Sequence, residues 1–162
     1  MEYDHTQRAP LHWLLVVPGT AMVVTAWYGM EPAWVGWVIS IVGALMITLS
    51  FCFRWLRMHS EEHALRFAFG PLGPFRNALR YDGIRSLRAD RSRWIDGWGI
   101  HYGVGRGWIW NLWGFDCVAL VLTDGMRLRL GTDDVEGLLS HLEARTGLQR
   151  ETAEAAAEEP VA

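Results

Sequence analysis

At 162 residues the chain is long enough for one ordinary domain and little more. Half of its residues (51%) are hydrophobic and 20% are charged, and the net charge of −3 favours no particular class of partner. Both fractions can be high because most hydrophobic and charged residues lie in different parts of the sequence. Between residues 11 and 53 the only charged residue is Glu31.

The first ten residues are expected to form a short cytoplasmic tail. Two apolar runs follow, residues 11–29 and 32–53, and the sequence GMEP marks a turn between them. Because about 20 apolar residues cross a bilayer core, residues 11–53 are predicted to form a transmembrane hairpin. A buried helical hairpin in a soluble core is disfavoured, since such helices seldom run this long without a charge. A cleaved signal peptide is disfavoured by the acidic Glu2 and Asp4 and by the lack of a small-residue cleavage site.

Aromatic and basic residues predict how the hairpin is oriented. Tryptophan and tyrosine prefer the two membrane interfaces, and these residues gather at both ends of the hairpin: Trp13 and Trp55 at one, and Trp27, Tyr28, Trp34 and Trp37 at the other. Arg8 precedes the first run and Arg54, Arg57 and Arg66 follow the second, whereas the turn has no arginine. The positive-inside rule therefore predicts a multi-pass protein of the inner (plasma) membrane with both termini in the cytoplasm. No disulfide is expected between Cys52 and Cys117.

Residues 54–147 read as a second, soluble domain built of strands and one helix. Alternating or apolar segments predict strands in residues 54–60, 63–70, 75–92, 98–104 and 115–132. The last is a hairpin, because Asp124-Gly125 is a strong two-residue turn signal. On its second arm one face carries Met126, Leu128 and Leu130, and the other carries Arg127 and Arg129.

A single helix is predicted over residues 132–147. Thr132 or Asp133 is the expected cap, since Asp133 and Glu136 have capping-box spacing, and Gly147 ends the helix. The helix has one apolar stripe, made by Val135, Leu138, Leu139 and Leu142. Residues 148–162 are acidic and rich in alanine and have no such stripe, so they are expected to be a disordered tail.

This order of elements resembles the bacterial PH-like domain membrane proteins, which carry two N-terminal transmembrane helices. The resemblance rests on LRYDGIRSLR (residues 79–88), GWGIHY (97–102) and LTDGMRLRLGTDDVEGLLSHL (122–142) and covers roughly residues 11–147. It implies an α+β fold with an antiparallel split β-barrel capped by a C-terminal helix. It further implies a domain that binds lipids, peptides or proteins and is not catalytic. The first loop departs from phosphoinositide-binding PH domains, because Glu61 and Glu62 stand where those domains are basic.

Two groups of residues are candidate contacts with a membrane or a protein partner. An arginine-rich run includes Arg85, Arg88, Arg91 and Arg93, which anionic lipid could attract, but ordinary solvation of a polar face explains it as well and nucleic acid is a third reading. The second group is Arg106 with Trp108, Trp110 and Trp113, in a glycine-rich stretch that lacks the dinucleotide-binding pattern. These rings could fill the core of a small barrel or form an exposed aromatic ledge. We expect at least one ring in the core and at least one near the surface.

The sequence HSEEH, from His59 through Glu62 to His63, matches an inverted zinc-protease pattern. It is expected to be a polar turn between strands, where the shared helix face that zinc catalysis needs is lost. The chain is therefore interpreted as a cytoplasm-facing binding or scaffolding module without enzymatic activity, metal or cofactor. Its expected partners are the lipid bilayer and a membrane protein, and not nucleic acid. The alternatives are a structural subunit of a larger membrane complex that uses the hairpin as its contact surface, and a zinc hydrolase through His59, Glu62 and His63.

Overall fold

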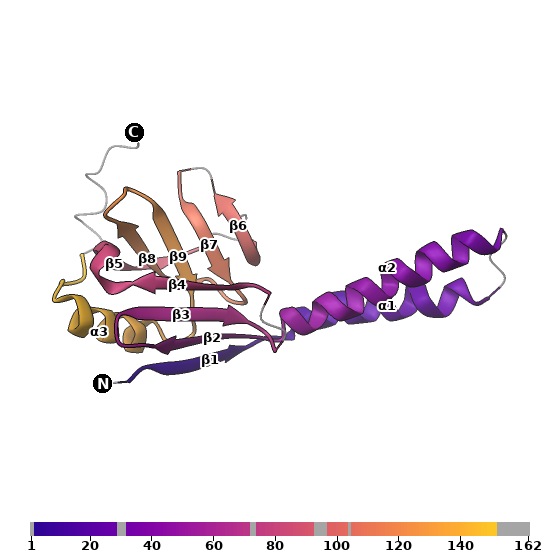
Figure 1. Ribbon diagram of the computed structural model, residues 1–162, viewed down its shortest axis with the longest axis horizontal. Coiled ribbons are helices and arrows are strands. Elements are labelled where there is room, and N and C mark those ends of the chain that lie inside the picture. The colour runs from indigo at the N-terminus through magenta and orange to yellow at the C-terminus, as the bar shows by residue number, and fades with distance from the viewer. Residues whose placement is uncertain (1, 29–31, 72–73, 93–96, 104, 152–162) are drawn as a thin grey trace.

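The computed structural model describes residues 2–28, 32–71, 74–92, 97–103 and 105–151. In this part of the chain the fold is α+β, with a pair of helices that projects from one end of a domain made of two sheets and a third helix (Figure 1). The predicted α+β class with mainly antiparallel sheets is confirmed at this level.

Helices α1 (Trp13–Ala26) and α2 (Ala33–Cys52) lie side by side, and a short 3-10 turn, η1 (Pro10–His12), leads into α1 (Figure 1). Small residues make the contact between them. A Cβ atom added at Gly43 would lie 2.6 Å from the carbonyl oxygen of Gly19, so the two backbones touch at this crossing. The large apolar side chains point outward instead, and the exposed ones include Trp13, Leu14, Val17, Trp27, Trp34, Trp37, Ile41 and Leu45.

The two helices differ in length, which corrects the predicted spans. Within the described residues α2 is the one helix long and apolar enough to cross a membrane. The continuous helical stretch Pro10–Ala26 is shorter, because the chain leaves the helix at Trp27 and Tyr28, where the prediction had continued the first span to residue 29. Pro18 lies within α1, and the helix continues through it.

The first ten residues are not a free tail, which is a second correction. Strand β1 (Asp4–Arg8) pairs antiparallel with β2 (Trp55–Ser60), from Asp4 opposite His59 to Arg8 opposite Trp55. Arg57 strengthens this pairing through a two-point contact with the carboxylate of Asp4. The helix pair is therefore an insertion between two neighbouring strands, and the domain starts before the helices and not at residue 54 as predicted.

Two sheets build the domain. The first has the order β1-β2-β3-β4 and the second β5-β8-β9-β7-β6. The remaining strands are β3 (Ala64–Phe69), β4 (Arg76–Arg80), β5 (Ile84–Arg91), β6 (Gly99–Gly103), β7 (Gly107–Asn111), β8 (Asp116–Leu122) and β9 (Arg127–Gly131), and η2 (Tyr81–Gly83) joins β4 to β5. The pairing of β7 with β9 is parallel, so the second sheet departs from the wholly antiparallel barrel that was expected.

The core lies between the sheets and is closed by α3 (Val135–Thr146). Phe67 of the first sheet meets Trp110 of the second edge to face, with ring centroids 4.9 Å apart. Leu138, Leu139 and Leu142 of α3 have no exposed surface, which confirms the predicted apolar stripe. Apolar side chains from three directions therefore meet in one continuous cluster, as a small domain needs.

The ends of α3 were predicted with one error. The cap is Asp134, whose carboxylate accepts a hydrogen bond from the backbone N–H of Gly137. Thr132 supports this cap by accepting from the N–H of Asp134, whereas Asp133 instead contacts His5 of β1 at 2.6 Å. Gly147 ends the helix in the left-handed region with φ of 72°, as predicted.

Polar aromatic residues fasten α3 to the rest of the domain. The hydroxyl of Tyr81 and Nε2 of His141 are hydrogen-bonded at 3.0 Å, and the ring of Tyr3 stacks on His141 with ring centroids 5.4 Å apart. Burial, with smaller contributions from Arg145 and the N-terminal charge, lowers the pKa of His141. Burial also raises the pKa of Tyr3. The His141 ring is thus favoured in its neutral form, and it links α3 to both η2 and the start of the chain.

Residues 148–151 belong to the domain, which corrects the predicted start of the tail. Leu148 packs against the core, and the backbone N–H of Glu151 donates to the carbonyl of Leu87 in β5. Arg150 contacts the carboxylates of Glu143 and Glu136, which in that order raise the pKa of its guanidinium. The rest of the predicted disordered tail, residues 152–162, lies outside the described residues.

Two truncations should separate these segments. A chain ending at Glu151 is expected to keep the melting temperature of the full chain, because every contact named above is retained. A chain ending at Gly147 should be less stable, by about 1–2 kcal/mol from the packing of Leu148 alone. Thermal melts of both proteins in detergent measure the difference. Equal melting temperatures for the two truncated chains would show that residues 148–151 contribute nothing.

Candidate functional site

The predicted aromatic segment divides between core and surface. Trp110 is 8% exposed and lies against Phe67 and Phe69 of β3, so its ring belongs to the core. Trp108, two residues earlier on β7, is 42% exposed and meets the exposed Tyr102 of β6 edge to face. The expected mixture of buried and surface rings is therefore seen. Trp108 and Trp110 were considered together as either core or surface residues, but Trp110 is in the core and Trp108 is at the surface.

Trp113 is 37% exposed and stacks on Trp98, with ring centroids 4.5 Å apart and planes 19° from parallel. This Trp98–Trp113 pair lies near the place where the two helices join the domain. The side-chain amide of Gln7 in β1 donates to the carbonyl of Trp113, and Gly99, next to Trp98, approaches the ring of Phe53 at the end of α2. Trp98 was not predicted as a contact residue, because its stacking partner Trp113 follows on the far side of the β6–β7 hairpin.

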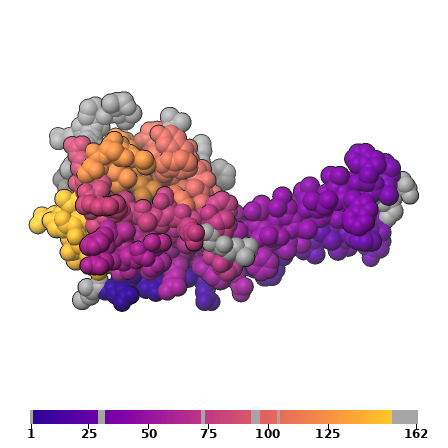
Figure 2. All heavy atoms as spheres, viewed as in Figure 1, coloured from indigo at the N-terminus to yellow at the C-terminus, as the bar shows by residue number. Residues whose placement is uncertain are grey.

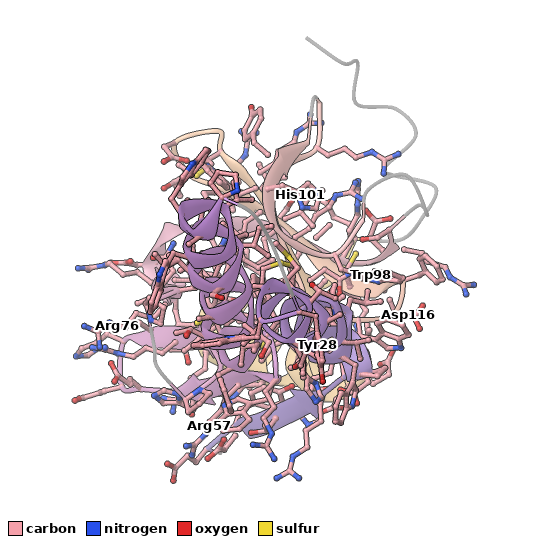
Figure 3. All side chains as sticks on the ribbon, turned by 90° about the vertical axis from the view of Figure 1, so that its right-hand side faces the viewer. Tyr28, Arg57, Arg76, Trp98, His101 and Asp116 are labelled. Carbon is pink, nitrogen blue, oxygen red and sulfur yellow. The ribbon has the colours of Figure 1, made fainter. Side chains whose placement is uncertain are left out.

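Other aromatic and basic side chains lie at the same junction between the helices and the domain. Arg54 lies over the ring of Trp55, with its guanidinium carbon 5.8 Å from the ring centre. His12, Trp13 and Arg54 line a hollow of about 280 Å³ between the two helices, at their domain end. Figure 3 looks at the domain from the helix side, and in this projection Arg57, Arg76, Trp98 and His101 lie around the helix pair. Trp13, Trp55 and the Trp98–Trp113 pair are of the residue type that favours a membrane interface, and Arg54 adds a positive charge beside them.

The predicted arginine run does not form one patch. Arg85 is exposed on β5, Arg91 lies 3.6 Å from the carboxylate of Asp116, and Arg93 is outside the described residues. Arg88 follows the register shift between Ile84 and Ser86, and its guanidinium lies 3.9 Å from the carboxylate of Asp90. The described arginines of the run therefore have different surroundings and do not gather in one patch.

A different set of arginines does come together, on the outer face of the second sheet. Arg88 pairs across β8 at Ala119, and Ala119 pairs with Arg129 of β9, so the small alanine lies between two guanidinium-bearing side chains. In the next row Ser86, Val121 and Arg127 stand side by side. With Arg106 these residues line a hollow of about 190 Å³, whose rim also includes Glu151. We call this feature the arginine hollow.

The arginine hollow is held by internal contacts. Arg129 is only 12% exposed and lies 2.9 Å from the carboxylate of Asp90, and Arg127 donates to the carbonyl of Gly105 at 3.0 Å. Arg88 and Arg106 were predicted as contact residues for other reasons, whereas Arg127 and Arg129 were identified only as the outward face of a strand. Their convergence depends on the register of three strands, which the sequence alone does not supply.

The zinc-protease pattern is divided between a strand and a turn. His59 lies on β2 opposite Arg66 of β3, whereas Glu62 and His63 follow in the turn, with side chains more than 80% exposed. A helix face that presents both histidines to one metal is therefore not formed. Among the described residues no group of three or more His, Cys, Asp or Glu side chains could hold a metal ion. The two thiols, Cys52 and Cys117, are buried and free.

The sequence matches no family model and no curated protein.

Proposed function

We propose that this chain is an integral membrane protein in which α1 and α2 cross the bilayer and hold a non-catalytic, PH-like binding or scaffolding domain at the cytoplasmic surface. The observation that carries the proposal is the helix pair itself, which is apolar on its outside and projects from a polar domain.

In the helix pair, large apolar side chains are exposed and small residues are buried, which is the opposite of the arrangement in a soluble protein. The pair's buried positions on α2 are small or compact, Gly36, Gly43, Ser50 and Cys52, whereas tryptophans and branched aliphatic side chains face outward along its length. In water such a continuous apolar surface would be strongly unfavourable, at about 25 cal/mol for each Å². Figure 2 shows the pair as an extension separate from the domain, so the domain does not cover this surface. A bilayer is the environment that favours it.

The β1–β2 pairing supports two crossings over one. Arg8 and Trp55 are partners in the ladder, so the chain leaves the domain and returns to it at the same place. If α2, about 30 Å long, crosses the hydrocarbon core, the segment before it must cross in the other direction. Residues 10–26 form a helix of about 25 Å, and the turn residues Trp27 and Tyr28 follow it. Interfacial aromatic residues and local thinning of the bilayer compensate for the shorter element.

Charge supports the orientation. Arg8, Arg54 and Arg57 lie at the domain end of the helix pair, and the far end has no arginine. The Trp98–Trp113 pair and Trp55 lie at the same end, where their rings would rest at the level of the lipid headgroups. Two sheets closed by α3 provide the rigid framework that a binding module needs, and the resemblance to PH-like proteins supports a binding role over catalysis.

Cysteine accessibility in the intact chain tests the topology, because both native thiols are buried. Tyr28→Cys, at the far end of the helices, should react in whole cells or spheroplasts with a maleimide that does not cross membranes. Ser140→Cys, on the exposed face of α3, should react only after the membrane is opened. Extraction at alkaline pH should leave both variants in the membrane. The reverse labelling pattern would overturn the orientation, and release at alkaline pH would overturn the membrane span.

A further inference from the structure

We propose that the arginine hollow is a binding site for a phosphate group, carried by a small phosphorylated molecule or by a lipid headgroup. The hollow lies on the outer face of the second sheet and involves residues of β5, β8 and β9 and the turn before β7. The inference extends the proposed function by naming a site and a ligand chemistry. It does not depend on the helices crossing a membrane, because the site lies within the domain.

The walls of the hollow follow from the strand register. Directly paired residues of neighbouring strands point to the same side of a sheet, so Arg88, Ala119 and Arg129 form one row across the outer face. Ala119 leaves space between two long side chains, and Ser86 and Val121 continue the floor in the next row. The space of about 190 Å³ accommodates a compact group such as a phosphate and excludes a large ligand from full burial.

Charge favours an anionic ligand. Four arginines, Arg88, Arg106, Arg127 and Arg129, line the hollow together with one carboxylate, Glu151, and Asp90 lies beside it in contact with Arg129. Even without Arg106, the three other arginines outnumber these two carboxylates, so the lining is positive. A phosphate monoester carries about −1.5 to −2 at neutral pH and is attracted by this excess. Guanidinium groups suit it further, since each can donate two parallel hydrogen bonds to phosphate oxygens.

Part of the site is preorganised. The carboxylate of Asp90 lies 2.9 Å from Arg129, and the carbonyl of Gly105 accepts a hydrogen bond from Arg127 at 3.0 Å. Because both side chains are already held in place, ligand binding costs little of their conformational entropy. Residues 148–151 bring Glu151 to the rim through its backbone hydrogen bond to Leu87. The Glu151 carboxylate therefore repels an incoming anion. Replacing Glu151 with glutamine is expected to increase the affinity for phosphate.

Titration of the full chain in detergent with glycerol 3-phosphate tests the site, followed through the backbone amide signals of β5, β8 and β9. Sodium chloride at matched ionic strength is the reference. We expect saturable shifts at the row Arg88–Ala119–Arg129. Arg88→Gln combined with Arg106→Gln should weaken binding about tenfold or more, since two charge-assisted contacts are lost. Glu151→Gln should tighten it by severalfold.

Arg85→Gln is the matched control, because Arg85 is an exposed arginine of the same strand outside the hollow. It should leave the affinity unchanged. Equal weakening by Arg85→Gln and by the double variant would show diffuse attraction and overturn the site. Shifts that do not saturate, or that chloride reproduces, would overturn it as well. Thermal melts establish that each variant is folded.

The source of the phosphate is decided by repeating the titration in nanodiscs. In phosphatidylcholine discs the soluble phosphate should bind as in detergent. If phosphatidic acid discs displace it from the same residues, the headgroup is the physiological source, and if binding is unchanged, the ligand is soluble. Either result supports a phosphate site. Loss of the response in both kinds of disc would contradict a site that is accessible beside a membrane.

Discussion

Replacing Leu139 with aspartate is expected to unfold the β-domain. Leu139 has no exposed surface and lies on α3 between the two sheets, beside the equally buried Leu138 and Leu142. Removal of a buried leucine side chain costs about 2–5 kcal/mol, and an unpaired buried carboxylate adds several more. A domain of this size has roughly 5–15 kcal/mol in total, so the substitution removes most or all of it.

Ser140→Asp is the control for this experiment, because it places the same charge one residue later on the exposed face of α3. The full chain should be measured in detergent by tryptophan fluorescence and circular dichroism during heating. A fragment starting at residue 54 is unsuitable, since it lacks β1 and the contact of Tyr3 with His141. We expect a cooperative transition for Ser140→Asp and none for Leu139→Asp. A melt close to that of the unchanged chain for Leu139→Asp would show that α3 does not close the core.

Elements with a local signal could be predicted from the sequence. The β8–β9 hairpin turns at Asp124-Gly125, where Gly125 has φ of 84°, and Leu128 and Leu130 alternate toward the core. The stripe on α3 repeats every three to four residues and was predicted correctly. Met126 was placed on the same face as Leu128 but is 44% exposed, because it lies beside the turn, where the pleat no longer decides burial.

Strand β1 shows why other elements could not be predicted. Its sequence, DHTQR, has no apolar alternation, and its buried residue is a glutamine, Gln7. The strand exists because β2 offers hydrogen-bonding partners, and β2 lies beyond both helices in the sequence. A local pattern cannot report a partner about fifty residues away. Strands β1 and β2 pair although the two helices separate them in the sequence, so the prediction of the helices gave no indication that these strands belong to one sheet.

The candidate surfaces depended on the same long-range information. The arginine run in residues 76–93 suggested a single patch, yet Arg88 lines the arginine hollow and the exposed Arg85 does not. The arginine hollow is instead assembled from β5, β8, β9 and one turn, each contributing residues that look unremarkable alone. The number and spacing of the arginines are read from the sequence. The strand register determines which of them lie close together.

The two tryptophans of β7 should respond very differently to the same substitution. Trp110→Ser removes a ring that packs on Phe67 and Phe69 and is expected to lower the free energy of unfolding by about 3–5 kcal/mol. Trp108→Ser removes a half-exposed ring whose aromatic contact is Tyr102, and such a pair contributes about 0.5–1.5 kcal/mol. Denaturant titrations of the full chain in detergent measure both values on one protein.

The comparison is informative because the two residues are two positions apart on one strand and are changed in the same way. Equal losses would show that Trp108 is also part of the core, which would remove it as a surface contact. If Trp108→Ser is nearly neutral for stability, its exposed ring is free to meet a partner. Trp108→Phe should then keep that contact, since an aromatic surface remains, and Trp108→Ser should lose it. The difference between these two variants in recovery of co-purified membrane proteins measures the contact separately from folding.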